Sequence, residues 1–175
     1  VFWGFGGGGG GSGAWWVGPS GAGDVDGAVG DGDGPVARVE VWDPATDSFA
    51  SAGTLATPRT EHTATLLPDG RVGVIAGEGT RTLSSVEVWD PGTGRVVWSV
   101  PGPLQTARYG HTATLLADGS VLFAGGTDDS ESFAIASAEV WDPRSGRSTL
   151  SAPLRTARAQ HAAVLLQDGR VLVVG

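Results

Sequence analysis

The sequence predicts an all-β fold built from repeated four-stranded antiparallel units. Two sequence blocks each occur three times, and an internal period of about 20–50 residues is typical of solenoids, propellers and repeat arrays. Each occurrence of the second block contains an Asp-Gly pair between apolar runs, which indicates a β-hairpin. Thirty Gly and 10 Pro among the 175 residues, without a helical pattern, favour many short strands joined by turns.

The two blocks define the repeating unit. The first block reads Glu-Val-Trp-Asp-Pro and occupies residues 40–44, 87–91 and 139–143. The second begins Leu-x-Thr-x-Arg-x-x-His, ends Asp-Gly-x-Val, and occupies residues 55–72, 104–121 and 154–171. Copies lie about 50 residues apart, which sets the length of one unit. The repeated motif residues are Arg59, His62, Arg108, His111, Arg158, His161, Trp42, Trp89 and Trp141.

Each unit is predicted to hold four strands. The first runs from the His to the Leu-Leu pair, and Asp-Gly then forms a type I′ hairpin turn, because this pair tolerates the positive φ that the turn requires. The second is continuously apolar and ends at small residues, as expected of a strand covered on both faces. Glu-Val-Trp forms the third strand, and Asp-Pro-x-Thr/Ser supplies the next turn. A weaker fourth strand is expected around 48–50, 96–99 and 148–151.

These units resemble the blades of the kelch family, which have four strands and about 50 residues. The resemblance is carried by a Gly-Gly doublet after strand two, an aromatic residue in strand three and a second aromatic seven positions later. Trp42 and Phe49 keep the aromatic pair, whereas Val96 and Ser148 replace its second member in the later copies. The doublets are assigned to Gly6-Gly7 and Gly125-Gly126, with a degraded copy at Gly77-Glu78.

The second block is similar to those of bacterial kelch proteins and of the propeller of galactose oxidase-like proteins. The Trp-Asp pairs and Gly110-His111 leave a WD40 interpretation open, although its period of about 40–45 residues is shorter than the one found here. Both interpretations predict a β-propeller, and the kelch resemblance implies about three repeats of a larger ring.

A propeller ring needs about 4–8 blades, so these repeats are not expected to close alone. Residues 1–58 are interpreted as a blade that lacks its first strand and carries a long loop at 8–35. Residues 59–104 and 105–154 form two further blades, and 155–175 supply the first two strands of another. Either the native protein is longer, which we expect, or copies self-associate through open blade edges.

The repeated polar residues are interpreted as blade architecture. A zinc ion bound by His62, His111 and His161 would need their nitrogens about 3.3 Å apart. Equivalent positions on packed sheets lie about 10 Å apart, so no metal is predicted there. The repeated Glu40, Glu87 and Glu139 are assigned to the scaffold for the same reason. Asp-x-Asp pairs at 24/26 and 31/33 lack a full Ca²⁺ loop and favour a Gly/Asp-rich linker, and no cofactor is predicted.

The irregular loops are the candidate binding region. Because strands alternate in direction, the connections from strand two to three and from strand four to one should emerge on the same face. Loops on rigid scaffolds often carry function, and in kelch proteins, as the resemblance implies, these loops form the partner-binding surface. The candidate binding residues are Trp15, Trp16, Arg108, Tyr109, Asp128, Asp129 and Glu131. Trp15 and Trp16 could equally well cap an open blade edge.

The favoured function is a non-catalytic scaffold that binds a protein or a carbohydrate. The alternative is the propeller portion of a galactose oxidase-like copper oxidoreductase, a chemistry that in the family uses Tyr, His and a Cys-linked Tyr. This chain has one Tyr, Tyr109, and no Cys, so those residues would lie outside it. A net charge of −8 argues against nucleic acid as a partner, and no apolar run has the length of a membrane span. The resemblance favours a secreted or cell-surface location, which the residues themselves leave open.

Overall fold

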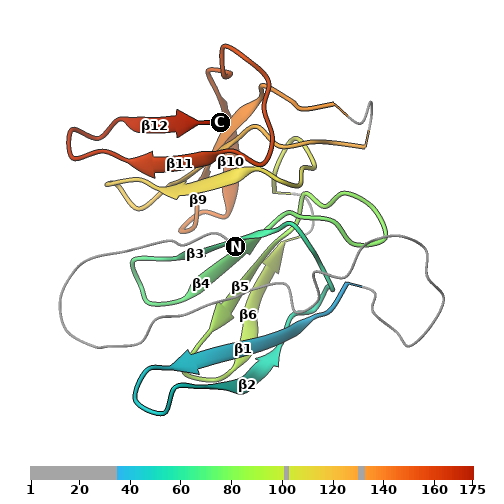
Figure 1. Ribbon diagram of the computed structural model, residues 1–175, viewed down its shortest axis with the longest axis vertical. Coiled ribbons are helices and arrows are strands. Elements are labelled where there is room, and N and C mark those ends of the chain that lie inside the picture. The colour runs from blue at the N-terminus through green and yellow to red at the C-terminus, as the bar shows by residue number, and fades with distance from the viewer. Residues whose placement is uncertain (1–34, 101–102, 130–132) are drawn as a thin grey trace.

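The computed structural model describes residues 35–100, 103–129 and 133–175, and all regular elements in these ranges are strands (Figure 1). They are β1 (Arg38–Asp43), β2 (Ser48–Thr54), β3 (Thr63–Leu66), β4 (Val72–Ile75), β5 (Val86–Asp90), β6 (Arg95–Val100), β7 (Thr112–Leu115), β8 (Val121–Ala124), β9 (Ala138–Asp142), β10 (Arg147–Ser151), β11 (Ala162–Leu165) and β12 (Val171–Val174). In these ranges no helix is long and apolar enough to span a membrane.

The strands form two complete blades flanked by two half-blades. β3-β4-β5-β6 and β7-β8-β9-β10 are four-stranded antiparallel sheets, whereas β1-β2 and β11-β12 are two-stranded. Figure 1 shows the two half-blades at opposite ends of the array. The first strands β3, β7 and β11 lie next to one another, as expected where successive blades meet at a propeller axis. The predicted all-β fold, a partial propeller of antiparallel blades, is confirmed. The second strand expected near Gly6-Gly7 lies outside the described residues.

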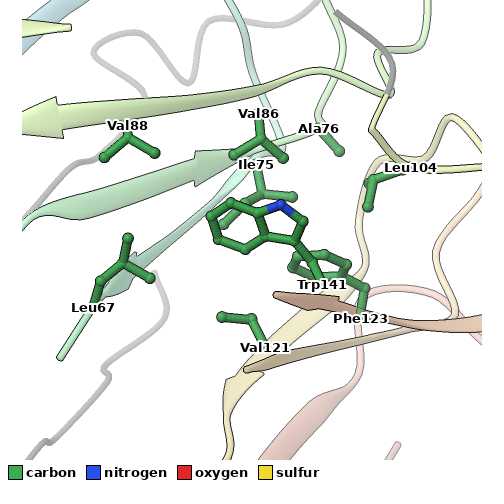
Figure 2. Close-up of a cluster of buried hydrophobic side chains, with 9 residues drawn as sticks. All are labelled: Leu67, Ile75, Ala76, Val86, Val88, Leu104, Val121, Phe123 and Trp141. Atoms are coloured by element: carbon green, nitrogen blue, oxygen red, sulfur yellow. The ribbon is translucent and has the colours of Figure 1, made fainter. Parts of the chain in front are cut away.

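Neighbouring blades pack through side chains that alternate along each strand. Ile75 and Val86 lie on the face of the β3–β6 blade that contacts the next blade, where Phe123 and Trp141 cover them (Figure 2). Trp89 points to the other side and packs among the residues of the β1–β2 half-blade. This alternation with a period of two explains why strands two and three are apolar almost throughout.

The repeated Trp residues occupy equivalent positions in register. Trp89 pairs with Val72 and Trp141 with Val121, and both indoles are buried, with 1% and 0% of their surface exposed. Trp42 holds the same position in β1, but within the described residues β1 pairs only with β2, and this indole is half-buried.

The Asp-Gly turns differ from the predicted type I′ geometry. Leu67 pairs with Arg71 across a three-residue loop, and the Gly70 N–H donates to the Leu67 carbonyl at 3.0 Å. Gly70 has a φ of +86°, whereas the φ of Asp69 is not positive. A type I′ turn would need positive φ at both central residues. Asp69 instead accepts the Arg71 N–H, and glycine alone takes the left-handed conformation.

The doublet after strand two is also assigned differently by the structure. Gly125 and Gly126 have φ values of +63° and +99°, and the matching pair in the preceding blade is Ala76 and Gly77, with +54° and +93°. The degraded doublet is therefore Ala76-Gly77 rather than Gly77-Glu78. Alanine tolerates its left-handed φ at a conformational cost, but the second position must be glycine because the connection into strand one approaches it closely.

Replacing Gly77 by Ala should therefore destabilise the fold more than replacing Gly70 by Ala. Both positions have positive φ, so each variant carries a conformational cost of about 1–2 kcal/mol. A Cβ at Gly77 would also lie 2.5 Å from the Thr60 carbonyl oxygen, whereas one at Gly70 meets no atom within 4 Å. Urea unfolding should give a lower midpoint for Gly77→Ala, and equal midpoints would contradict the close approach.

Candidate functional site

The Arg of the repeated Arg-x-x-His motif lies on the connection that leads into strand one. Arg59 is fully buried, and its Nη2 donates to Glu87 Oε1 on β5 at 2.5 Å. Its Nη1 donates to the Ala76 carbonyl, at the end of strand two, at 2.8 Å. The Glu87 carboxylate also accepts the backbone N–H groups of Ala56 and Thr57 at 2.6 and 3.0 Å. The ion pair therefore fastens the incoming connection to strands two and three of one blade.

The next blade repeats this arrangement. Arg108 Nη2 donates to Glu139 Oε1 at 2.7 Å, and Nη1 donates to the Gly125 carbonyl at 2.9 Å. Glu139 accepts the backbone N–H groups of Gln105 and Thr106 at 2.8 and 3.0 Å. Both charged side chains are buried, so two copies of the repeat bury an ion pair at the same place.

The third copy has the arginine without a carboxylate. Arg158 Nη1 donates to the Gly175 carbonyl at 2.9 Å, the bond that matches those of the first two copies. The salt bridges among the described residues include none from Arg158, because β11 and β12 have no described third strand beside them.

Burial and ion pairing shift the pKa values of the buried Arg and Glu side chains in opposite directions. Burial lowers the pKa of Arg59 and Arg108, and the facing carboxylates act to raise it. Burial alone would raise the pKa of Glu139, but donors hold it below its ordinary value: the Gln105 N–H, the Ser148 hydroxyl, the Thr106 N–H and Arg108. Each buried guanidinium therefore faces a carboxylate, and a buried charge left alone would be costly.

The repeated His residues lie immediately before strand one, and two of them contact the preceding blade. His111 Nε2 lies 2.9 Å from Thr63 Oγ1, and His161 Nε2 lies 3.1 Å from Thr112 Oγ1. Burial, together with the charge of the Arg in each motif, lowers the pKa of His111 to about 3 and that of His62 to about 4. These imidazoles are therefore neutral at neutral pH.

The described part of the chain contains no set of side chains that would let the His residues bind a metal ion. No three His, Cys, Asp or Glu side chains there come together in a way that could hold a metal ion. The absence of metal uptake remains a prediction for solution experiments.

The connection into strand one and the connection between strands two and three lie together in both complete blades. An isolated bridge pairs Thr60 with Glu78 in the first blade, and another pairs Tyr109 with Thr127 in the next. The Gly110 N–H donates to the Glu61 carbonyl at 3.2 Å, which links these connections across the blade boundary. Residues from four separate connections therefore share one surface.

Carboxylates from both blades lie near Tyr109 on this surface. Burial raises the pKa of Glu78, and the charges of Glu61 and Asp129 raise it further. Burial also raises the pKa of Tyr109, and Glu78, Glu61 and Asp129 add to that rise. The Asp129 carboxylate accepts hydrogen bonds from the backbone N–H and the hydroxyl of Thr82 in the neighbouring blade. We call Glu61, Glu78, Tyr109 and Asp129 the acidic loop face.

The structure places the predicted binding residues in different surroundings. Tyr109 and Asp129 belong to the acidic loop face, and Asp128 is half-buried beside it. Arg108 requires a correction: its place in the connection from strand four to strand one suggested the surface, but its guanidinium is buried against Glu139 and is closed to a partner. Trp15, Trp16 and Glu131 lie outside the described residues.

Three residues of this surface were missed by sequence reasoning. Glu61 and Glu78 stand where the next copy has Gly110 and Thr127, so their departure from the repeat was the available signal. Phe133, in the connection between β8 and β9, is 71% exposed. Exposed aromatic side chains are enriched where proteins bind partners.

Glu139→Gln should destabilise the protein by about 3–5 kcal/mol, because it leaves the Arg108 guanidinium buried without a counter-charge. The matched control is Asp69→Asn, which removes the exposed pair with Arg71 and should cost less than about 1 kcal/mol. Urea unfolding measures both values. A similar small effect of the two changes would mean that the buried pair contributes little.

The buried His residues should make stability fall with acidity. Their folded-state pKa values lie below the unfolded value of about 6.5, so the stabilising effect is complete above that pH and is lost as pH falls toward about 4 and 3. Between pH 7.5 and 5, each such His should remove about 2 kcal/mol of unfolding free energy. His111→Gln should remove about 2 kcal/mol of this pH dependence, whatever its effect at pH 7.5. An unchanged slope would contradict a buried neutral His111.

No protein-family model and no curated protein matches this chain. Among solved structures, it is similar to a fungal alcohol oxidase of the AA5 family in complex with copper, with a TM-score of 0.66 and 20% identity. The match covers 79% of this chain but only 32% of the oxidase chain. Such a likeness supports the fold alone. At that level, the resemblance to the propeller of galactose oxidase-like proteins is confirmed.

Proposed function

We propose that this chain is a non-catalytic propeller scaffold that binds a protein or a glycan at the acidic loop face. The observation that supports this most directly is the gathering of Glu61, Glu78 and Asp129 around Tyr109 from the connections of two blades. In the two complete blades the repeated Arg and Glu residues are paired with each other, so the irregular carboxylates are left to meet a partner.

The chemistry of the face restricts the partner. Carboxylates accept hydrogen bonds, and their mutual repulsion already raises the pKa of Glu78, so a ligand that brings donors or positive charge relieves it. The hydroxyl groups of a glycan or the Lys and Arg side chains of a protein segment supply such donors. Tyr109 and Phe133 add aromatic area, on which sugars and apolar side chains pack.

Binding should therefore be weakened by Tyr109→Ala and by Glu78→Gln, each by more than about 1 kcal/mol if these residues form the centre of the interface. A glycan array and an array of Arg- and Lys-containing peptides identify the ligand, and titration calorimetry gives its affinity. Salt separates the two classes, because screening weakens a cationic peptide strongly and a neutral glycan little.

The control is Arg144→Ala, an exposed residue in the β9–β10 turn on the opposite face. It should leave affinity unchanged. If Arg144→Ala lost binding while both loop-face variants kept it, the ligand site would lie on the opposite face, and the proposal would be contradicted.

The similarity to a copper-containing alcohol oxidase favours a second candidate, the propeller portion of a copper oxidoreductase. The residues of this chain do not fit a copper site: it has one Tyr and no Cys, and its described residues hold no group of three suitable ligands. Copper ligands would have to come from a longer protein. Copper-dependent oxygen consumption with a primary alcohol, by the product of the full reading frame, would favour this candidate over the scaffold.

A further inference from the structure

Two hydrogen bonds join loops of the two complete blades within the acidic loop face. Asp129, in the connection between β8 and β9, accepts the backbone N–H of Thr82 at 3.0 Å and also the Thr82 hydroxyl. Thr82 lies in the connection between β4 and β5 of the neighbouring blade and is buried, with 5% of its surface exposed. Both carboxylate oxygens of Asp129 are therefore engaged by one residue of the other blade. We call this pair of hydrogen bonds the loop contact.

The loop contact is not part of the repeated blade architecture. An isolated bridge pairs Glu78 with Thr82 in one blade, and the matching bridge of the next blade pairs Thr127 with Ala134. Ala134 therefore occupies the position of Thr82, and it has no hydroxyl to donate. The donor of the loop contact departs from the repeat, as Glu61 and Glu78 do.

Other hydrogen bonds hold the boundary between the complete blades, and these do recur. The Gly77 N–H donates to the Arg108 carbonyl at 2.9 Å, and at the following boundary the Gly126 N–H donates to the Arg158 carbonyl at the same distance. Bonds that occur at both boundaries account for the stacking of the blades. The loop contact occurs at one of them, so it adds something that the stacking does not require.

The loop contact connects the two residues on which the proposed binding face depends most. On one side, Thr82 forms the isolated bridge with Glu78. On the other side, Asp129 follows Thr127 by two positions, and Thr127 exchanges backbone hydrogen bonds of 2.8 and 3.0 Å with Tyr109. A short series of hydrogen bonds therefore links the loop of Glu78 to Tyr109 across the blade boundary.

We propose that Thr82 and Asp129 are positioning residues of the acidic loop face. Their contact holds the loops of two blades in one arrangement, so that Glu78 and Tyr109 meet a partner as a preformed surface. A preformed surface loses less conformational freedom on binding, which strengthens the complex. The inference rests on the proposed function, and it assigns Asp129 to the support of the face rather than to contact with the partner.

The single tyrosine of the chain allows a test that needs no ligand. Burial and the charges of Glu78, Glu61 and Asp129 raise the pKa of Tyr109, so the ultraviolet absorbance of its tyrosinate reports how these carboxylates are placed. Thr82→Val removes the hydroxyl donor without changing any charge, and it should lower this pKa because Asp129 is held less firmly. Thr82→Ser keeps the hydroxyl and should titrate like the wild type. An unchanged titration in Thr82→Val would overturn the proposal.

Urea unfolding separates a positioning role from a purely structural one. Thr82→Val and Thr82→Ser should have similar midpoints, because the backbone bonds that recur at the blade boundaries remain in both. If Thr82→Val lowered the midpoint as far as Gly77→Ala does, the loop contact would support the blades rather than the face, and the proposal would fail.

Binding measurements separate this inference from the proposed function. The probe is an oligo-arginine peptide or, if that does not bind, the tightest-binding glycan of the array. Thr82→Val should weaken the probe about threefold to tenfold, the effect of ordering a loop side chain on binding, and Thr82→Ser should restore wild-type affinity. If Asp129 contacted the partner instead, its freed carboxylate would maintain or strengthen binding in Thr82→Val, which would overturn the positioning role.

A wild-type protein that binds neither class of probe would contradict the proposed function. The Tyr109 titration would still decide whether the loop contact places the carboxylates of the face, because that measurement needs no partner. The two failures are therefore distinguishable.

Discussion

The buried Arg–Glu pair is the interaction on which the geometry of each complete blade depends. Two opposite charges with no exposed surface are tolerable only when paired and hydrogen-bonded, so Arg59 and Glu87 must meet wherever this chain folds. Glu87 also holds two N–H groups of the incoming connection, and Arg59 holds the end of strand two. One interaction therefore fixes the path of the chain between blades as well as the spacing of strands within one.

That constraint decides which residues remain available for function. The guanidinium groups of Arg59 and Arg108 form ion pairs inside the blades, where no partner can reach them. The buried imidazoles of His62 and His111 are neutral at neutral pH. The carboxylates that depart from the repeat, Glu61 and Glu78, have no such internal role and lie on the loop surface near Tyr109. The negative charge of this surface therefore comes from carboxylates that the interior ion pairs do not use.

Much of the fold could be predicted from the sequence, because the repeated residues indicate where strands and turns lie along the chain. The positions of β8 and β9 follow from an apolar run and from Glu-Val-Trp, and both patterns depend only on neighbours along the chain. The turn at Asp69-Gly70 was assigned to the wrong type, because Asp-Gly suits several hairpin loops and the pairing of Leu67 with Arg71 selects among them. Arg108 was wrongly assigned to the surface, because its place in the connection from strand four to strand one says nothing about which way its side chain turns.

The sequence by itself determined the repeat, the order of strands and the places where copies depart from one another, since these are properties of a linear pattern. The tertiary structure alone decided the partners: that Arg108 meets Glu139 and that Thr82 meets Asp129. Such contacts join residues 31 and 47 positions apart, at distances set by how sheets stack rather than by spacing in the chain.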